Sequence, residues 1–368
     1  MASTPAVDRT ARVAEWLLPT LGGLLAIAAF YLTLFVRAGS LFGGDGDVGR
    51  HIRVGTDILL TRSIPRVDLY SHTMGGEHFG PYEWRSVVIF AWAHQVAGLA
   101  GVAILTGLLF TGGVAVVYVT MVRWGIPTFV AFAFGFAALL LQSAHLLPRP
   151  HLFTTLLVAV YALVLHEIRR GANPRWLLWL PVLMALWANV HGGFLLGFIV
   201  LILFGMYTVW QWWPDRNAEL AIRIRWIGLT IALCFGASLL TPAGLELWPH
   251  TTGYLGKDFL VDNTQEYRSP DFHTPLGRIF MLALLYGVCA LAWLRSRVNA
   301  LGLASYVLFA AFALHSARNI PIFGVICVPW MAAWTLEVLR QPDSPARTHR
   351  FLGWAEELDL TTSRLVGW

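Results

Sequence analysis

Long apolar runs, separated by short polar or Gly/Pro-rich segments, recur along almost the whole chain. The hydrocarbon core of a bilayer is about 30 Å thick and is crossed by about 20 apolar residues in a helix. We expect spans near Trp16–Val36, Val102–Val122, Pro127–Leu141, Leu152–Leu165, Trp176–Ala188, Phe194–Trp212, Trp226–Leu240, Ile279–Leu294, Ala300–Leu314 and Ile320–Leu339. The pattern predicts an all-α polytopic membrane protein with about ten transmembrane helices.

The amino-acid composition also indicates a membrane protein and argues against nucleic acid as a partner. Of the 368 residues, 57% are hydrophobic and 13% charged, and the mean hydropathy is +0.62, which is far from the values of soluble domains. The net charge of +5 comes almost wholly from arginine, since Lys257 is the only lysine. These arginines sit in short connections between apolar runs, so they indicate membrane topology and not a nucleic-acid surface.

Few other chemistries are supported. Cys234, Cys289 and Cys327 all lie within apolar runs without paired spacing, so we interpret them as packing residues and expect neither a disulfide framework nor a metal knuckle. The chain contains no phosphate-binding Walker loop, no dinucleotide-binding glycine fingerprint after a strand and no H-E-x-x-H motif. Nucleotide hydrolysis and zinc proteolysis are therefore disfavoured.

Arginine also predicts the orientation, because cytoplasmic loops carry the excess of positive charge. With ten spans, one side collects Arg9, Arg12, Arg123, Arg169, Arg170, Arg175, Arg216, Arg223, Arg225, Arg295, Arg297, Arg340, Arg347 and Arg350. We expect this side to be cytoplasmic in a bacterial inner membrane. We divide the chain into a transmembrane domain, residues 1–340, and a polar tail, residues 341–368, with long extracytoplasmic loops at 39–85 and 241–278.

The first long loop has its own predicted structure. From Val48 to Leu60, apolar residues recur at helical spacing, which predicts a short amphipathic helix lying on the membrane. The apolar run Val87–Val96 is too short to cross and is followed by Gly98-Leu99-Ala100-Gly101, so we expect a second interfacial helix there.

This loop also gathers ionisable side chains at the membrane boundary. Asp45, Asp47, His51 and Glu83 lie close to predicted membrane helices, where such groups are costly unless they are solvated, paired or functional. An alternative is that the two aspartates stand in water, cap the helix that begins near Val48 and pair with nearby arginines.

The residues GDGDVGRHIRVGTDILLTRSIPRVDLYSHT, followed by Glu83-Trp84, resemble the first extracytoplasmic loop of GT-C type integral-membrane glycosyltransferases. That superfamily includes protein mannosyltransferases, aminoarabinose transferases and oligosaccharyltransferases. The chain is most similar to a bacterial multi-spanning group, through the later elements RPHLF, ANVHGGF, EYRSPDF and RNIP. Two features depart from the superfamily: Gly46 separates the acidic pair, and the soluble C-terminal domain of many members has no counterpart.

The resemblance implies a site that takes a polyprenyl-phosphate sugar on the extracytoplasmic face. Asp47 or Asp45 is then the expected catalytic base, with Glu83 as a further catalytic candidate. A divalent metal, magnesium or manganese, could be held by Asp45, Asp47 and Glu266, whose hard oxygens suit it. Metal dependence differs within the superfamily and stays open.

Other polar residues at the outer ends of the spans are candidates for substrate binding. They are His51, Arg149, His151, His191, Glu266, Tyr267, Arg318 and Asn319. Arginine forks suit phosphate oxygens, and a carboxylate beside an aromatic ring suits a sugar. The alternatives are ordinary: Arg149 snorkels to lipid headgroups, His191 packs between helices, and Glu266 pairs with Arg268 in a solvated loop.

The sequence thus predicts a glycosyltransferase that moves a sugar from a polyprenyl-phosphate donor to an acceptor at the outer membrane face. The alternative from another class is a non-enzymatic protein that binds lipid headgroups or transports a substrate. Transporters tend to place charge near the membrane midplane, whereas here it lies at the outer ends of the spans. A structural subunit of a larger membrane complex is a third interpretation.

Overall fold

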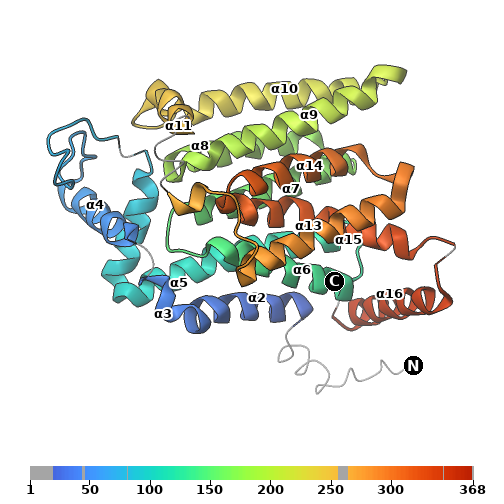
Figure 1. Ribbon diagram of the computed structural model, residues 1–368. Coiled ribbons are helices and arrows are strands. Elements are labelled where there is room, and N and C mark those ends of the chain that lie inside the picture. Colours follow the sequence, from blue (N-terminus) through green and yellow to red (C-terminus); the bar gives the residue numbers. More distant parts are fainter. Residues whose placement is uncertain (1–19, 44–45, 81, 256–263, 343, 367–368) are drawn as a thin grey trace, which may run out of the picture.

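The computed structural model describes residues 20–43, 46–80, 82–255, 264–342 and 344–366, almost all of them helical (Figure 1). Asp45 lies outside the described residues. The α-helices are α2 (Leu21–Tyr31), α3 (Ala38–Leu41), α4 (Asp47–Thr61), α5 (Trp84–Arg123), α6 (Thr128–Gln142), α7 (His151–Arg169), α8 (Trp179–Val190), α9 (Leu195–Asp215), α10 (Ala218–Ser238), α11 (Leu247–Leu255), α13 (Pro275–Leu294), α14 (Ala300–His315), α15 (Ile320–Leu339) and α16 (Ala346–Val366). Short helical turns include the π-turn η1 (Leu32–Val36) and the 3₁₀ turns η2 (Ser143–His145), η3 (Pro174–Leu178), η4 (Gly192–Phe194), η5 (Gly244–Glu246), η6 (Gln265–Tyr267), η7 (Arg295–Arg297) and η8 (Ala317–Asn319).

The all-α polytopic membrane class is confirmed. Seven helical segments of the described chain are long and apolar enough to cross a bilayer, and they contain α5, α6, α7, α9, α10, α13 and α15. Two further helical segments, Leu21–Val36 and α14, are as apolar as a membrane span but shorter than the seven segments. Each of the ten predicted runs does contain a helix, but the count of ten spans stays a prediction.

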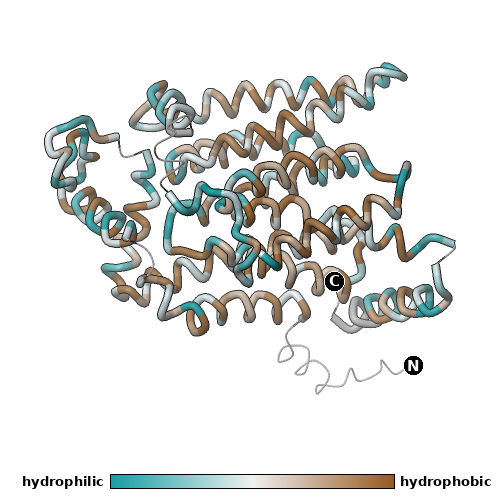
Figure 2. Tube along the Cα trace, viewed as in Figure 1, coloured by the Kyte–Doolittle hydropathy of each residue, from teal (hydrophilic) through white to brown (hydrophobic). Residues whose placement is uncertain are grey.

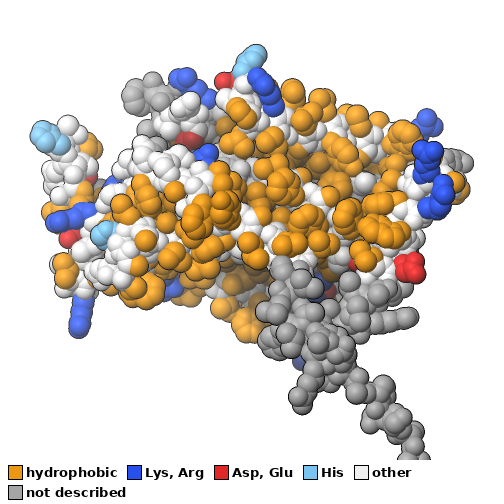
Figure 3. Space-filling view, turned by 90° about the horizontal axis from the view of Figure 1, so that it is seen from below, with side chains coloured by type: hydrophobic (Ala, Val, Ile, Leu, Met, Phe, Trp, Pro, Cys, Tyr) orange, Lys and Arg blue, Asp and Glu red, His pale blue; other side chains and the backbone are white. Residues whose placement is uncertain are grey.

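The long helices lie side by side and form one bundle (Figure 1). Apolar residues dominate its middle, and polar residues gather in the connections at its two ends (Figure 2). One face of the molecule shows the same division, with hydrophobic side chains over the middle and arginines at both ends (Figure 3). This distribution is expected of a bundle whose middle meets lipid and whose ends meet water.

The helix α15 forms the centre of the bundle. In the segment Ala317–Leu339, which contains α15, 72% of the most apolar 18-residue stretch is buried inside the protein. The corresponding share for α13, which is equally apolar, is 17%. A helix that is apolar on all sides must be covered on all sides by protein or by lipid. We conclude that α15 is covered by other helices, whereas α13 turns most of its surface to the lipid.

The first outer loop contains the predicted amphipathic helix, which is α4. Its buried face consists of Val48, His51, Val54, Gly55 and Ile58. The predicted helical spacing of apolar residues is thus confirmed, and this face packs against α5 through Gly55. The unexpected member of the buried face is His51.

The run Val87–Val96 forms a helix of its own, as predicted, because a sharp bend divides α5 into two helices. Ala97 and Gly98 have non-helical backbone angles, with φ of +59° at Gly98. A Cβ atom on Gly101 would lie 2.1 Å from the carbonyl oxygen of Ala93. Eight residues of straight helix would separate these positions by about 12 Å. The chain therefore folds back here, and α4 and the start of α5 lie together at one end of the bundle (Figure 1).

Gly55 is where α4 approaches α5 most closely. A Cβ atom there would lie 2.0 Å from the backbone oxygen of Val87, whereas one on Gly49 of the same helix meets nothing within 4 Å. We expect Gly55→Ala to lower the free energy of unfolding by about 1–3 kcal/mol, as overpacking does. Gly49→Ala should be neutral or stabilising, because alanine favours helix. Thermal unfolding of both variants in detergent tests this, and equal midpoints would contradict the close packing.

The opposite end of the bundle carries the arginine-rich connections and α16. The predicted polar tail contains this helix, which docks on the start of α6. The backbone N–H of Thr128 donates to Asp359 Oδ2 at 2.8 Å, and the Thr128 hydroxyl bonds the other carboxylate oxygen. Pro127 precedes α6 and has no polar side chain for capping, so Asp359 satisfies a donor that the first turn of α6 leaves open.

Candidate functional site

Polar side chains from separate segments meet at the α4 end of the bundle. Arg149 precedes α7, and its Nη2 lies 3.3 Å from Asp47 Oδ2 while its Nη1 lies 3.2 Å from Glu266 Oε2. Gly46 is the N-cap of α4 and no side chain caps that helix, so Asp47 is its first residue and pairs with Arg149. The predicted capping role of Asp47 is therefore not what the structure shows.

The carboxylate of Glu266 is surrounded by cationic or potentially cationic groups. Besides Arg149, Arg318 Nη1 lies 3.7 Å from Glu266 Oε1, and His145 Nε2 lies 3.5 Å from Glu266 Oε2. The Glu266 side chain is only 21% exposed and that of Arg149 only 22%, so water screens these charges incompletely. Glu266 is therefore not the solvated loop residue of the alternative interpretation.

Backbone bonds hold Glu266 in this position. The Ala317 N–H donates to the carbonyl of Arg268 at 2.9 Å, and the Ser316 hydroxyl donates to the carbonyl of Glu266 at 3.1 Å. These bonds join the turns η6 and η8, which lie about fifty residues apart in the chain. Arg318 in addition donates to the hydroxyl of Tyr267 and lies over its ring, with Cζ 4.7 Å from the ring centroid.

A second carboxylate, Glu83, faces His191. Glu83 Oε1 lies 3.6 Å from His191 Nε2. The other ring nitrogen, Nδ1, accepts bonds from the Gly193 N–H at 3.0 Å and from the Thr154 hydroxyl at 2.8 Å. That hydroxyl is available as a donor because it accepts from Trp187 Nε1 at 2.8 Å. With Nδ1 accepting two bonds, Nε2 carries the ring proton and points it at Glu83.

The residues Ala188–Phe194 hold His191 in the position from which it contacts Glu83. His191 has extended backbone, φ −165°, and ends α8. A Cβ atom on Gly193 would lie 2.5 Å from Thr154 Oγ1, so only glycine allows the approach. Asn189 Oδ1 accepts from Trp84 Nε1 at 2.7 Å, which ties the residue after Glu83 to α8.

Burial shifts the proton affinities of this pair. It raises the pKa of Glu83 to about 7, although Arg50 and Arg318 oppose the shift. It lowers the pKa of His191 to about 3, and the charge of Arg318 contributes to the same shift. At neutral pH His191 is therefore a neutral donor, whereas Glu83 exchanges its proton readily. Strongly shifted pKa values in one polar cluster are typical of functional sites.

Three other residues predicted to bind substrate lie around the charged cluster and support its structure. His51 is 3% exposed and stacks on Phe90, and its charge would contribute to the lowered pKa of His191. His151 bonds the carbonyl of His145 through Nε2 at 2.7 Å, so it supports that histidine. Asn319 donates to the carbonyl of Phe312 at 3.1 Å and so satisfies the end of α14.

Of the three predicted metal ligands, Asp45 lies outside the described residues, and the other two, Asp47 and Glu266, share a cationic partner. The guanidinium of Arg149 bridges Asp47 and Glu266, so a cation already neutralises both carboxylates. Within the described parts of the chain, no group of three or more His, Cys, Asp or Glu side chains is placed to hold a metal ion. We derive no catalytic step through a metal.

Three residues of the cluster were missed in the sequence. His145 contacts Glu266, while Thr154 and Trp187 orient His191. His145 lies four residues before Arg149, so proximity to that motif was a usable signal. Thr154 and Trp187 lie inside apolar runs, where a polar group gives no sequence signal of its role.

The fold and the cluster define a multi-pass α-helical membrane protein with a charged site at one end of its bundle. A comparison with models of known protein families finds no match, and a comparison with curated proteins finds none. What the site does is therefore argued from its geometry.

Proposed function

We propose that the chain is a glycosyltransferase that uses a polyprenyl-phosphate sugar as donor at the α4 end of the bundle. The observation that carries the proposal is that Arg149, Arg318 and His145 converge on one anionic group, the carboxylate of Glu266. A second carboxylate, Glu83, stands in the same cluster with a pKa of about 7. An anion-binding centre beside a near-neutral base suits transfer from a phosphate leaving group.

The two arginines would hold the phosphate of the donor. Guanidinium groups form paired, charge-assisted bonds to phosphate oxygens, and these bonds strengthen when the surroundings exclude water. Arg149 is paired with two carboxylates and Arg318 with one, so a phosphate would share or displace these partners. The apolar surface of the neighbouring helices offers the polyprenyl chain a lipid-like environment.

Glu83 is the candidate base that the geometry favours over Asp47. The Asp47 side chain is 46% exposed, and its Oδ2 lies 3.3 Å from Arg149 Nη2, so a guanidinium already occupies the carboxylate that would have to face the acceptor. Glu83 would accept the proton of the acceptor hydroxyl as the hydroxyl oxygen bonds to the anomeric carbon. The bond from that carbon to the phosphate oxygen breaks, its electron pair stays on the phosphate, and polyprenyl phosphate leaves. His191 would orient Glu83 through its Nε2 proton.

We further propose that this site faces the outside of the cell. The opposite end carries Arg123, Arg169 and Arg340 at the ends of α5, α7 and α15, as expected for the cytoplasmic side. A cysteine replacing the exposed Glu77, in a chain without its three native cysteines, should react with an impermeant thiol reagent outside intact cells. Labelling that requires lysis would reverse the orientation.

Transfer itself is tested with the purified full chain in proteoliposomes. The donors are radiolabelled polyprenyl-phosphate glucose and mannose, and a panel of methyl glycosides and the membrane lipids serve as acceptors. We expect release of polyprenyl phosphate and a labelled product from at least one donor. Binding of farnesyl phosphate without turnover of any donor would instead support the non-enzymatic headgroup-binding alternative.

A further inference from the structure

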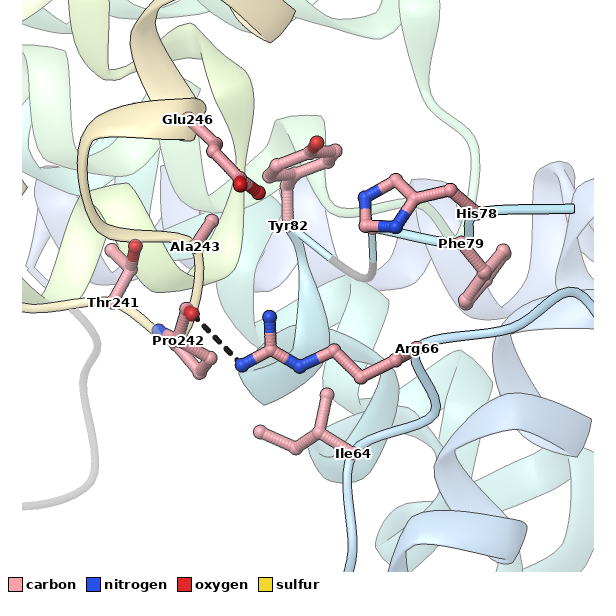
Figure 4. Close-up of a pocket in the computed structure, with 10 residues that line it drawn as sticks. Ile64, Arg66, His78, Phe79, Tyr82, Thr241, Pro242, Ala243 and Glu246 are labelled. Atoms are coloured by element: carbon pink, nitrogen blue, oxygen red, sulfur yellow. Dashed lines mark hydrogen bonds between the residues drawn. The ribbon is translucent and has the colours of Figure 1, made fainter.

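The pocket between the two outer loops is nearly filled by its own side chains (Figure 4). A cavity of about 20 Å³ remains there, which is room for about one water molecule. Arg66 lines this pocket and donates from Nη2 to the carbonyl of Pro242 at 3.1 Å. The contact joins the two loops, so the pocket is a structural joint and not a ligand site. A more open surface lies at the arginine-rich end of the molecule, on α16.

The helix α16 buries one face and leaves a second apolar face open. Leu352 and Ala355 are buried, and Leu352 belongs to the apolar core of the bundle. Phe351, Trp354 and Leu358 are 38%, 47% and 36% exposed. These three side chains recur at positions i, i+3 and i+7, so they form one stripe along the helix, the α16 stripe.

Polar contacts to two other helices hold α16 in place. Besides the bonds from Thr128 of α6 to Asp359, Nη2 of Arg340 lies 2.8 Å from Oε1 of Glu356. Arg340 directly follows α15, so α16 is joined to the ends of both α6 and α15. The direction in which the α16 stripe faces is therefore set by the bundle.

The α16 stripe continues the lipid-facing surface of α6. The ring centroid of Phe129 lies 6.2 Å from that of Phe351 and 5.8 Å from that of Trp354. Phe129 is itself exposed, and so is Phe136, seven residues further along the same face of α6. The segment that contains α6 is long and apolar enough to cross a bilayer, so exposed phenylalanines on it meet lipid. Aromatic rings at the end of such a helix lie at the level of the headgroups.

Basic side chains lie beside this stripe. Arg347 and Arg350 are exposed, and they lie one helical turn before Phe351 and Trp354 respectively. Glu356, which pairs with the end of α15, lies on the opposite side of the helix from the stripe. An apolar stripe flanked by arginines is typical of helices that bind an anionic lipid surface.

We propose that α16 binds the phospholipid leaflet at the arginine-rich end of the bundle. The α16 stripe enters the leaflet at the boundary between headgroups and lipid chains, and Arg347 and Arg350 contact anionic phosphates. Lipid is favoured over another protein as the occupant because the stripe is continuous with Phe129 on the lipid-facing side of α6. This inference does not depend on the proposed transferase activity.

The experiment places a nitroxide spin label on the full chain after its three native cysteines have been replaced by serine. Trp354→Cys and Phe351→Cys carry the label on the α16 stripe. Gly353→Cys is the matched control, since Gly353 is exposed on another face and a Cβ atom there meets nothing within 4 Å. The chain is reconstituted in vesicles of equal parts phosphatidylcholine and phosphatidylglycerol. We expect the labels on the stripe to collide with oxygen and to be shielded from a water-soluble nickel complex, and the control label to show the reverse.

Two outcomes would overturn lipid as the occupant. If the labels at positions 354 and 351 are as open to nickel as the label at position 353, the stripe faces water. If they are shielded from both oxygen and nickel, a second copy of the chain or another protein covers the stripe.

A charge reversal tests the role of the two arginines. Arg347→Glu combined with Arg350→Glu should lower the ratio of lipid-immersed to water-exposed label at position 354 by about fivefold or more, because one basic residue near an anionic surface contributes about that factor. The same variant should leave the ratio unchanged in vesicles of phosphatidylcholine alone. An unchanged ratio in the anionic vesicles would contradict the assigned contact between these arginines and the leaflet.

Discussion

Glu83→Gln is expected to reduce sugar transfer by about 10²–10⁴-fold, the usual contribution of a general base. Glutamine keeps the shape of the side chain and can still contact His191, but it cannot accept a proton. The measurement is the initial rate of product formation with a donor that the native chain uses. Asp47→Asn, at the position favoured from sequence, should retain more activity, because Asp47 is paired with Arg149.

The pH dependence of this variant provides a second measurement. The native rate should rise as pH increases through about 7, where Glu83 loses its proton, and Glu83→Gln should abolish the rise. Because the folded chain holds this proton at a higher pH than the unfolded chain, Glu83 makes stability fall as pH rises from about 4.5 to about 7. The glutamine variant should therefore unfold at a higher temperature than the native chain at pH 8. Normal turnover by Glu83→Gln, combined with loss in Asp47→Asn, would return the base to Asp47.

Arg149→Gln is expected to weaken binding of farnesyl phosphate by about 10–100-fold, the effect of losing a charge-assisted hydrogen bond. The variant also leaves Asp47 and Glu266 without their shared cation, so its thermal midpoint should fall. Arg149→Lys keeps the charge but not the fork, and should recover stability better than it recovers phosphate binding. Binding is measured by calorimetry in detergent, with farnesol as the uncharged reference ligand.

Arg53→Gln is the matched control for this prediction. Arg53 lies at the same end of the molecule and pairs with Asp57 at 3.1 Å, but its side chain is 72% exposed. Such a pair contributes little to stability, and a nonspecific effect of lost charge would appear equally in both variants. If Arg53→Gln weakens farnesyl phosphate binding as much as Arg149→Gln, the arginines act only through the overall potential and the phosphate site is wrong.

Much of the fold could be predicted because lipid imposes a simple rule. Every backbone polar group inside a bilayer must be bonded internally, so a long apolar run becomes a helix almost regardless of its detailed sequence. The same rule is weak at the ends of helices, where water can satisfy the backbone. The bend at Gly98 was indicated by its glycines, but the packing of Gly55 on Val87 was not, since it depends on where α5 turns back.

The candidate site was predicted in part for a similar reason. Charged residues at the boundary of a membrane segment are costly, so Asp47, Glu83, Arg149, Glu266 and Arg318 stood out against their apolar surroundings. Sequence could not say which of them touch. The pairing of Glu83 with His191, and the encirclement of Glu266 by Arg149 and Arg318, join segments that lie far apart in the chain.

The sequence by itself determined the class of this protein and its helical runs, because hydrophobicity acts locally and depends on residue type alone. The tertiary structure decided which carboxylate is desolvated. Asp47 and Glu83 are both acids beside a membrane helix. Asp47 pairs with Arg149 and is 46% exposed, whereas Glu83 is desolvated opposite a neutral histidine. Proton affinity depends on desolvation and on neighbouring charges, and both are set by packing between helices that the order of residues does not reveal.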